Sequence, residues 1–305
     1  MKKAIDLFAG AGGFSLGAKK AGYNVVWASN HWQAAVDIHK ANHPCAAHVC
    51  QDLHQANWCE VPSHDLMLAS PACTGHTPAR GVNQPHHDAA RSTAWAPVSC
   101  AEVHRPYAAL IENVPAFGRW VLWRAWCAAW HALGYSVSPH ILDAADLGVP
   151  QHRVRLVVVC TRSKHPLALD MPKLAHIPAS RIVDFNTGRW SKIDKPGRAV
   201  STLHRAAAGR RAHGDRFVMP YYGSGSGKTG RSLNRPLGTV TTHDRWALVD
   251  GDRMRMLTID ENRAASGFPA GYKLPSDSKQ ALFMLGNSFP PAFAESVIRA
   301  LDRAL

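Results

Sequence analysis

The stretch Asp6-Leu7-Phe8-Ala9-Gly10-Ala11-Gly12-Gly13-Phe14-Ser15 decides the fold of this chain. It overlaps a short apolar segment at residues 3–8, which predicts a buried strand, and it leads into a helical pattern that runs to about Ala21. Glycines between a strand and a helix let a ligand approach the backbone. The turn alone is weak evidence for any particular ligand, because the same glycines occur in dinucleotide sites and in simple tight connections.

Strands and helices alternate after this first unit. The sequence predicts further strands at 24–29, 109–114 and 155–160 and a helix at 32–42. Two more predicted strands end near Asp52 and near Ser70. Such alternation indicates an α/β fold with a doubly wound, mostly parallel, Rossmann-like sheet. Ligands of such sheets bind at the carboxyl ends of the strands.

A second, smaller domain is expected from about 165 to 255, where Arg, Gly, Ser, Thr and Pro replace long apolar runs. Within it, residues 195–205 and 235–245 resemble two copies of one extended unit. The tail from Leu282 is amphipathic and predicts a helix that docks on the first domain. The expected first domain is therefore 1–164 plus about 256–305.

Composition points to a folded protein with a polyanionic partner. The 305 residues are 46% hydrophobic and carry 35 Lys and Arg against 22 Asp and Glu, a formal net charge of +13. Seven cysteines without a C-x-x-C pair indicate neither a disulfide framework nor a zinc knuckle, so we expect a cytoplasmic protein. No apolar run approaches the roughly 20 residues of a membrane span. No Cys/His set has metal-ligand spacing, and we expect no metal.

Five motifs occur in a fixed order along the chain. They are residues 6–17 (DLFAGAGGFSLG), 71–73 (PAC), 112–114 (ENV), 151–155 (QHRVR) and 286–288 (GNS), and 255–269 adds a further stretch. Together they resemble the cytosine-C5 DNA methyltransferase family. The resemblance implies a class I S-adenosylmethionine-dependent fold with a target-recognition domain, acting on a base flipped out of double-stranded DNA.

The resemblance assigns catalytic roles to four residues. The thiolate of Cys73 attacks C6 of the flipped cytosine, and thiolates are favoured by nearby positive charge. Glu112 holds the N3 and amino edge of the base, while Arg153 and Arg155 hold its carbonyl and neighbouring phosphates. In a competing interpretation, Glu112 and Arg155 merely form an ion pair at a strand end.

The resemblance also implies a cofactor site. Trp32 would stack on adenine and Asp52 would accept a hydrogen bond from its amino group, although Trp32 also suits ordinary core packing. His31 stands where the family usually has an acidic residue that binds the ribose. The remaining expected cofactor residues are Phe8, Ala9, Gly10, Gly12, Gly13, Asn287 and Ser288.

Contacts with DNA are expected from a loop and from basic residues. Residues 74–95 predict a long loop that closes over the flipped base in the family. The segment 223–229 lacks the first glycine of a phosphate-binding P-loop, since Tyr222 stands there, and it suits a basic loop along DNA. The residues expected to contact DNA are Arg80, Arg205, Arg210, Arg211, Lys228, Arg231 and Arg245.

The target base stays open between two alternatives. The family's usual Pro-Pro-Cys-Gln is replaced by Pro71-Ala72-Cys73-Thr74. Ser70-Pro71 matches half of the motif of amino-methylating enzymes, in which a side-chain oxygen such as that of Ser70 orients adenine N6. We favour cytosine C5. A tRNA methyltransferase of the same family and a DNA-binding protein that has lost activity are the more distant alternatives.

Overall fold

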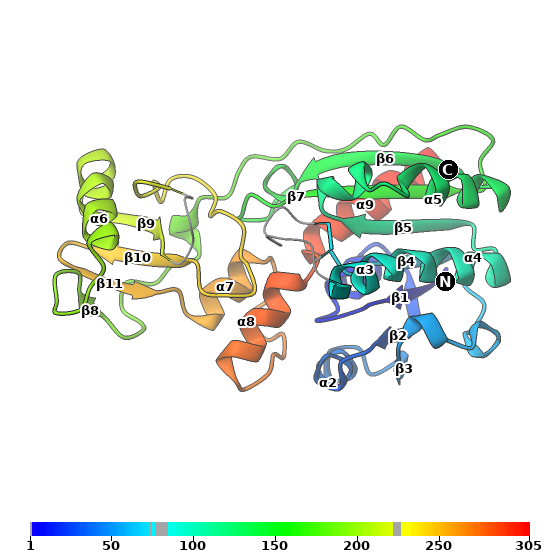
Figure 1. Ribbon diagram of the computed structural model, residues 1–305, viewed down its shortest axis with the longest axis horizontal. Helices are drawn as coiled ribbons and strands as arrows, with labels where there is room; N and C mark the ends of the chain where they lie inside the picture. Colours follow the sequence, from blue (N-terminus) through cyan, green and yellow to red (C-terminus); the bar gives the residue numbers. More distant parts are fainter. Residues whose placement is uncertain (1, 74, 77–84, 222–226) are drawn as a thin grey trace. The chain divides into compact units, whose positions relative to one another are not determined.

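The computed structural model describes residues 2–73, 75–76, 85–221 and 227–305 (Figure 1). The chain divides into two compact units. The first comprises Met1–Asp143, Val154–Lys173 and Phe289–Leu305, and the second comprises Ala144–Arg153 and Leu174–Ser288. The later boundary lies at 289 and not near 256, and residues 144–153 leave the first unit. One reason is Gln151, whose amide donates to the carbonyl oxygen of Ala265 at 2.9 Å.

The first unit is built on a seven-stranded sheet in the order β3-β2-β1-β4-β5-β7-β6. β1 to β5 pair with one another in parallel, whereas β7 is antiparallel to both β5 and β6. The mostly parallel sheet expected from the sequence is thus confirmed. The strands are β1 Lys3–Leu7, β2 Asn24–Asn30, β3 Ala47–Cys50, β4 Leu66–Ala69, β5 Ala108–Asn113, β6 Ser136–Asp143 and β7 Val154–Thr161.

Strand β6 was not predicted from the sequence. It lies at the edge of the sheet and contains Pro139, a residue that lacks a backbone donor. Proline is tolerated in edge strands but weakens the strand pattern. The central strand β4, by contrast, is buried throughout, and its continuous apolar run made it easy to predict.

Helices cover both faces of this sheet, with α4 and α5 on one side and α9 on the other (Figure 1). Gly17 of α1 lies so close to α9 that an added Cβ would sit 2.4 Å from the Cβ of Ala294. α9 therefore packs on the first unit, as expected for the tail, whereas residues 282–288 of the predicted tail helix belong to the second unit. The helices of this unit are α1 Gly13–Lys20, α2 Gln33–Asn42, α3 Pro85–Ser92, α4 Ala96–His104, α5 Trp123–Ala132 and α9 Pro291–Ala304.

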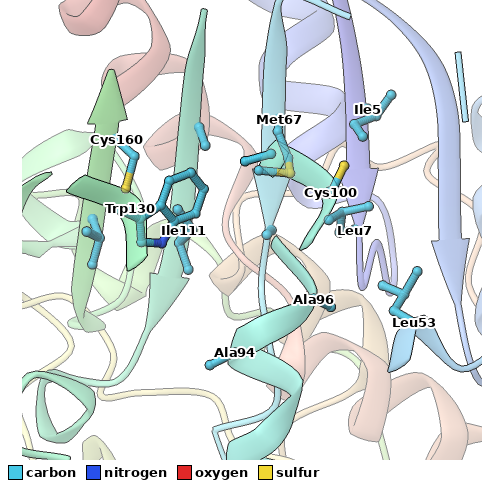
Figure 2. Close-up of a cluster of buried hydrophobic side chains, with 14 of the residues drawn as sticks. Ile5, Leu7, Leu53, Met67, Ala94, Ala96, Cys100, Ile111, Trp130 and Cys160 are labelled. Carbon is cyan, nitrogen blue, oxygen red and sulfur yellow. The ribbon is translucent and has the colours of Figure 1, made fainter. Parts of the chain in front are cut away.

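The core beneath α4 and α5 combines strand residues with helix residues (Figure 2). Leu7, Met67 and Ile111 from the strands meet Cys100 of α4 and Trp130 of α5, and all five are fully buried. Burial raises the pKa of the Cys100 thiol to about 12, so this cysteine stays neutral. Cys100 thus acts as a small apolar packing residue.

The second unit contains an antiparallel sheet in the order β8-β11-β10-β9. α6 packs on β9, where an added Cβ at Gly209 would lie 2.3 Å from the ring of Phe217. The elements are β8 Ser191–Lys192, α6 Val200–His213, β9 Arg216–Pro220, β10 Trp246–Asp250, β11 Arg253–Met256, α7 Ile259–Ala265 and α8 Ser278–Asn287.

The prediction of two equivalent copies at 195–205 and 235–245 is wrong. The first copy runs into α6, which is rich in alanine and arginine. The second copy is irregular and carries an isolated bridge between Leu237 and Gln151. Gly238 there faces the ring of Trp246 so closely that an added Cβ would lie 2.2 Å from it. The two similar sequences therefore adopt different backbone conformations, because their packing partners differ.

The long loop predicted at 74–95 is wrong in its second half. Residues Pro85–Ser92 form α3, and Thr93–Trp95 continue as a short 3-10 helix, η4. Proline at the first helical position and two alanines favour this helix. Residues 74 and 77–84 lie outside the described residues.

The structure adds two observations on membranes and metals. None of the helices built from described residues has both the length and the apolarity of a membrane span. Within the same part of the chain, no three His, Cys, Asp or Glu side chains group as metal ligands.

Candidate active site

Three neighbouring parallel strands bring the main motifs to one edge of the sheet. β1, β4 and β5 are adjacent, and their carboxyl ends lead into the glycine-rich turn, Pro71–Cys73 and Glu112–Asn113 respectively. The register pairs Leu7 with Ala69 and Ala69 with Ile111. This is the edge where doubly wound sheets bind their ligands.

The backbone before Cys73 is held from two sides. Asn113 Nδ2 donates to the carbonyl oxygen of Pro71 at 3.0 Å, and the backbone N–H of Ala72 donates to Thr93 Oγ1 at 3.0 Å. Cys73 itself is half-buried. Asn113 and Thr93 were not singled out from the sequence, although Asn113 stands inside the ENV motif. They fix the position of the Cys73 backbone.

Glu112 and Arg155 form an ion pair at the same edge. Arg155 Nε lies 2.8 Å from Glu112 Oε1, and the two side chains are 13% and 9% exposed. Arg155 Nη1 also donates to the carbonyl oxygen of Val154 at 2.8 Å. The pair orients the carboxylate, and this geometry suits both a catalytic pair and the competing interpretation of a structural ion pair.

Arg153 is held inside the second unit. It is 3% exposed, and its guanidinium donates to the carbonyl oxygens of Val240 at 3.1 Å and Gly286 at 2.9 Å. These bonds tie the QHRVR motif to the segment of Asn287 and Ser288, at the end of α8. Ser288 Oγ donates to the carbonyl oxygen of Leu285 at 2.8 Å.

The glycine-rich turn has a backbone that other residues rarely adopt. Gly10 and Gly12 have φ values of +52° and +82°. Asp6, at the end of β1, accepts hydrogen bonds from the backbone N–H and the hydroxyl of Ser15 at 3.1 and 2.7 Å. Burial raises the pKa of Asp6 to about 7, while the bonds from Ser15 lower it. Asp6 thus ties the start of α1 to β1 and shapes the turn.

Histidines of α2 and β3 extend this network. His39 Nε2 is hydrogen-bonded to Ser15 Oγ at 2.9 Å, and its Nδ1 to His48 Nε2 at 2.8 Å. Burial lowers the pKa of His39 well below its ordinary value. A neutral His39 therefore supports the turn from beneath. No motif indicated this role, because the partners lie on different elements.

The expected adenine site lies beyond β2 and β3. Asn30 pairs with Cys50 in the sheet, so Trp32 and Asp52 follow neighbouring strand ends. Trp32 is half-buried at the start of α2, and its backbone N–H donates to Asn30 Oδ1 at 3.0 Å. His31 between them is exposed.

Asp52 carries a hydrogen-bonding partner that the sequence did not indicate. Its Oδ1 accepts from the backbone N–H of His54 at 3.0 Å and lies 2.8 Å from His54 Nδ1. The backbone hydrogen bond and then the side-chain bond lower the pKa of Asp52. The carboxylate stays ionised near neutral pH and serves as an acceptor.

The residues expected to contact DNA differ in their surroundings. Arg80 lies outside the described residues. Arg205 donates to the carbonyl oxygens of Gly227 and Pro220 at 2.9 and 2.8 Å, and the Arg231 guanidinium lies 5.0 Å from the Trp246 ring centroid. The remaining four are Arg210, hydrogen-bonded to the carbonyl oxygen of Gly251, the exposed Arg211 and Lys228, and the half-buried Arg245.

The fold and the site define a class I methyltransferase. Residues 2–303 match the family model described as C-5 cytosine-specific DNA methylase. The chain belongs to this family, and it is a DNA cytosine-5 methyltransferase. The cytosine C5 target favoured by the motifs is thereby confirmed over adenine N6.

Individual relatives agree with the family match. The type II methyltransferase M.NlaX of Neisseria lactamica is 26% identical over 317 residues, covering 100% of this chain and 97% of the relative. M.AgeI of Thalassovita gelatinovora is 31% identical over 192 residues, but the match spans only 59% of this chain and 43% of that relative. The structure of a DNMT2 mutant from Spodoptera frugiperda shares the fold, with a TM-score of 0.69, 16% identity, and coverage of 99% of this chain and 100% of that one.

Proposed function

We propose that the protein methylates C5 of a cytosine flipped out of duplex DNA, with Cys73 as the nucleophile and S-adenosylmethionine as the methyl donor. The main support for this proposal is the backbone of Pro71 and Ala72, which hydrogen bonds to Asn113 and Thr93 hold in place. The Glu112–Arg155 ion pair lies at the same edge of the sheet. A rigid approach to the reacting atom supports covalent catalysis, since small displacements of a nucleophile reduce the rate strongly.

The residues of the first unit fit the methyl donor. An added Cβ at Gly10 would meet only the carbonyl oxygen of Phe8, at 3.8 Å, so the turn leaves room for a ligand against the backbone. The turn, Trp32 and Asp52 would hold the donor. S-adenosylmethionine supplies an electrophilic methyl group bound to a positively charged sulfur.

Cys73 starts the reaction by forming a bond from its thiolate sulfur to C6 of the cytosine, which makes C5 nucleophilic. C5 then takes the methyl group as the bond between that group and the donor sulfur breaks. Transfer of the C5 proton to solvent and cleavage of the bond from C6 to the Cys73 sulfur restore the ring and free the thiolate. Glu112 holds the N3 edge during these steps, and Arg155 keeps the carboxylate in place. Arg153 acts at one remove, by fixing the backbone at Gly286.

The second unit is proposed to recognise the DNA target. Its basic residues suit phosphate contacts and readout of base edges in the major groove. Arg211 and Lys228 are exposed and suit phosphates, whereas Arg205 is engaged with backbone carbonyls and shapes the sheet edge instead.

A single labelling experiment tests this function. Duplex DNA is incubated with the protein and a tritiated methyl donor, then digested to nucleosides and analysed by mass spectrometry. We expect 5-methylcytosine. A digest containing only N6-methyladenine would overturn the assignment, and the absence of label on every duplex would indicate a binding protein. Competition between duplex DNA and tRNA for the label tests the choice of nucleic acid.

A further inference from the structure

A chain of three side chains joins the adenine site to α3. Asp52 Oδ1 lies 2.8 Å from His54 Nδ1, and on the other side of the ring His54 Nε2 is hydrogen-bonded to Ser92 Oγ at 2.8 Å. Because an ionised carboxylate only accepts hydrogen bonds, the proton between Asp52 and the ring belongs to Nδ1. Both ring nitrogens are engaged, so the imidazole is fixed at two ends.

The two hydrogen bonds to Asp52 both fall on Oδ1, one from the backbone and one from the ring of His54. Among the residues that the structure describes, none donates to Oδ2. The side chain is 58% exposed at the carboxyl edge of the sheet. Asp52 therefore presents one oxygen to a ligand while the other oxygen fixes its orientation.

We propose that His54 and Ser92 are positioning residues for the methyl donor, holding the Asp52 carboxylate so that Oδ2 accepts a hydrogen bond from the adenine amino group. The inference rests on the proposed function, in which Asp52 contacts adenine. Without the hydrogen bonds that link Asp52, His54 and Ser92, the Asp52 side chain stays mobile until the donor binds. Binding then has to immobilise the side chain, and this loss of conformational entropy weakens the affinity.

The position of Ser92 gives the chain a second consequence. Its neighbour Thr93 accepts from the backbone N–H of Ala72, and its other neighbour Arg91 donates to the carbonyl oxygen of Gly75 at 2.8 Å. Three consecutive residues thus anchor the donor site and both sides of the Cys73 segment. Ser92 acts on donor affinity, whereas Thr93 acts on the reacting segment.

The test measures donor affinity and turnover separately. Binding of S-adenosylhomocysteine is measured by calorimetry for the wild type, Ser92→Ala, Ser92→Thr, His54→Ala and Thr93→Val. We expect Ser92→Ala and His54→Ala to weaken binding about 3–10-fold, the size of one immobilised side chain. The KM for the donor should rise equally while kcat at saturating donor changes little, and Ser92→Thr should restore affinity. Thr93→Val should lower kcat and keep the affinity.

Two comparisons make the result decisive. If Ser92 acts through Asp52, the double variant Asp52→Ala/Ser92→Ala binds no more weakly than Asp52→Ala alone, and additive losses overturn the inference. Wild-type affinity in Ser92→Ala overturns it too. Ser163→Ala, whose hydroxyl bonds to the carbonyl oxygen of His165 elsewhere in the first unit, is the matched control and should behave as wild type.

Failure of the proposed function gives a different pattern. Unchanged affinity in Asp52→Ala would remove Asp52 from the donor site, and the inference would fall with it. Wild-type protein that puts no label on duplex DNA would instead refute the methylation of DNA, while the binding measurements would still decide the role of Ser92.

Discussion

At the scale of single residues, Cys73 is the side chain on which the proposed chemistry depends. A serine hydroxyl is a poor nucleophile at neutral pH, so Cys73→Ser should lower methylation of cytosine by at least about a thousandfold. Transfer of tritiated methyl groups to duplex DNA measures the loss, and a gel-shift assay shows whether binding persists.

The exposed Cys59 provides the matched control for this substitution. Cys59→Ser should keep wild-type turnover, because the residue lies in the short helix Trp58–Glu60, away from the motifs. Substantial turnover in Cys73→Ser would contradict covalent catalysis by this residue.

The sequence predicts roles for residues that belong to a motif. Cys73, Glu112 and Asp52 were predicted because each stands in a recognisable run, Cys73 and Asp52 just after a strand and Glu112 near the end of β5. The contacts of Thr93 with Ala72 and of His54 with Ser92 could not be predicted, since these partners lie 21 and 38 residues apart along the chain. Such contacts depend on how α3 returns to the sheet, which no local pattern encodes.

At the scale of elements, the contact between α1 and α9 depends on a missing side chain. At Gly17 an added Cβ would lie 2.4 Å from the Cβ of Ala294 and 2.7 Å from the carbonyl oxygen of Pro291. Overpacking of this kind costs about 1–3 kcal/mol. Gly17→Ala should therefore lower the thermal midpoint by several degrees, although alanine favours helices.

Gly271 offers a control for this prediction, because an added Cβ there meets nothing within 4 Å. Gly271→Ala should leave the midpoint within about 1 °C of wild type, as expected of a surface change. Equal midpoints for both variants would show that α9 shifts freely on α1.

Elements with a clear apolar pattern in the sequence were predicted correctly. Elements whose conformation depends on tertiary packing were not. The buried runs of β4 and β5 predict strands wherever they lie. The resemblance between 195–205 and 235–245 failed because helix formation in α6 and the fit of Gly238 against Trp246 depend on different neighbours. Tertiary packing decided these segments, and propensity alone did not.

At the scale of the whole molecule, buried histidines make the first unit sensitive to acid. Burial lowers the pKa of His43 and of His64 to about 4, while unfolded histidine titrates near 6.5. Between these values the unfolded chain binds more protons, so stability falls as the pH drops from about 6.5 to 4. Asp6 has the opposite sign, because its raised pKa of about 7 favours the folded state in acid, but it is one group against several.

Urea unfolding at pH 7 and pH 5 checks this expectation. The midpoint should be lower at pH 5, and His64→Gln should reduce the difference because one buried titrating group is removed. The exposed His165 is the control, and His165→Gln should leave the difference unchanged. A midpoint that rises on acidification would show that Asp6 outweighs the histidines.

The net charge of +13 is a property of the whole molecule. In the proposed function, basic residues of the second unit contact the DNA phosphates. Binding of duplex DNA should weaken as salt increases, because each neutralised phosphate releases counterions and contributes about −0.9 to the slope of log K against log salt concentration. Arg211→Ala and Lys228→Ala should each make this slope shallower by about that amount and weaken binding to all sequences alike. Lys164→Ala removes one exposed charge from the first unit and should keep the wild-type slope. Fluorescence anisotropy of a labelled duplex at several salt concentrations measures all four proteins. Equal slopes for all of them would move the DNA contacts away from Arg211 and Lys228, whereas a shallower slope only for Lys164→Ala would place the phosphates on the first unit.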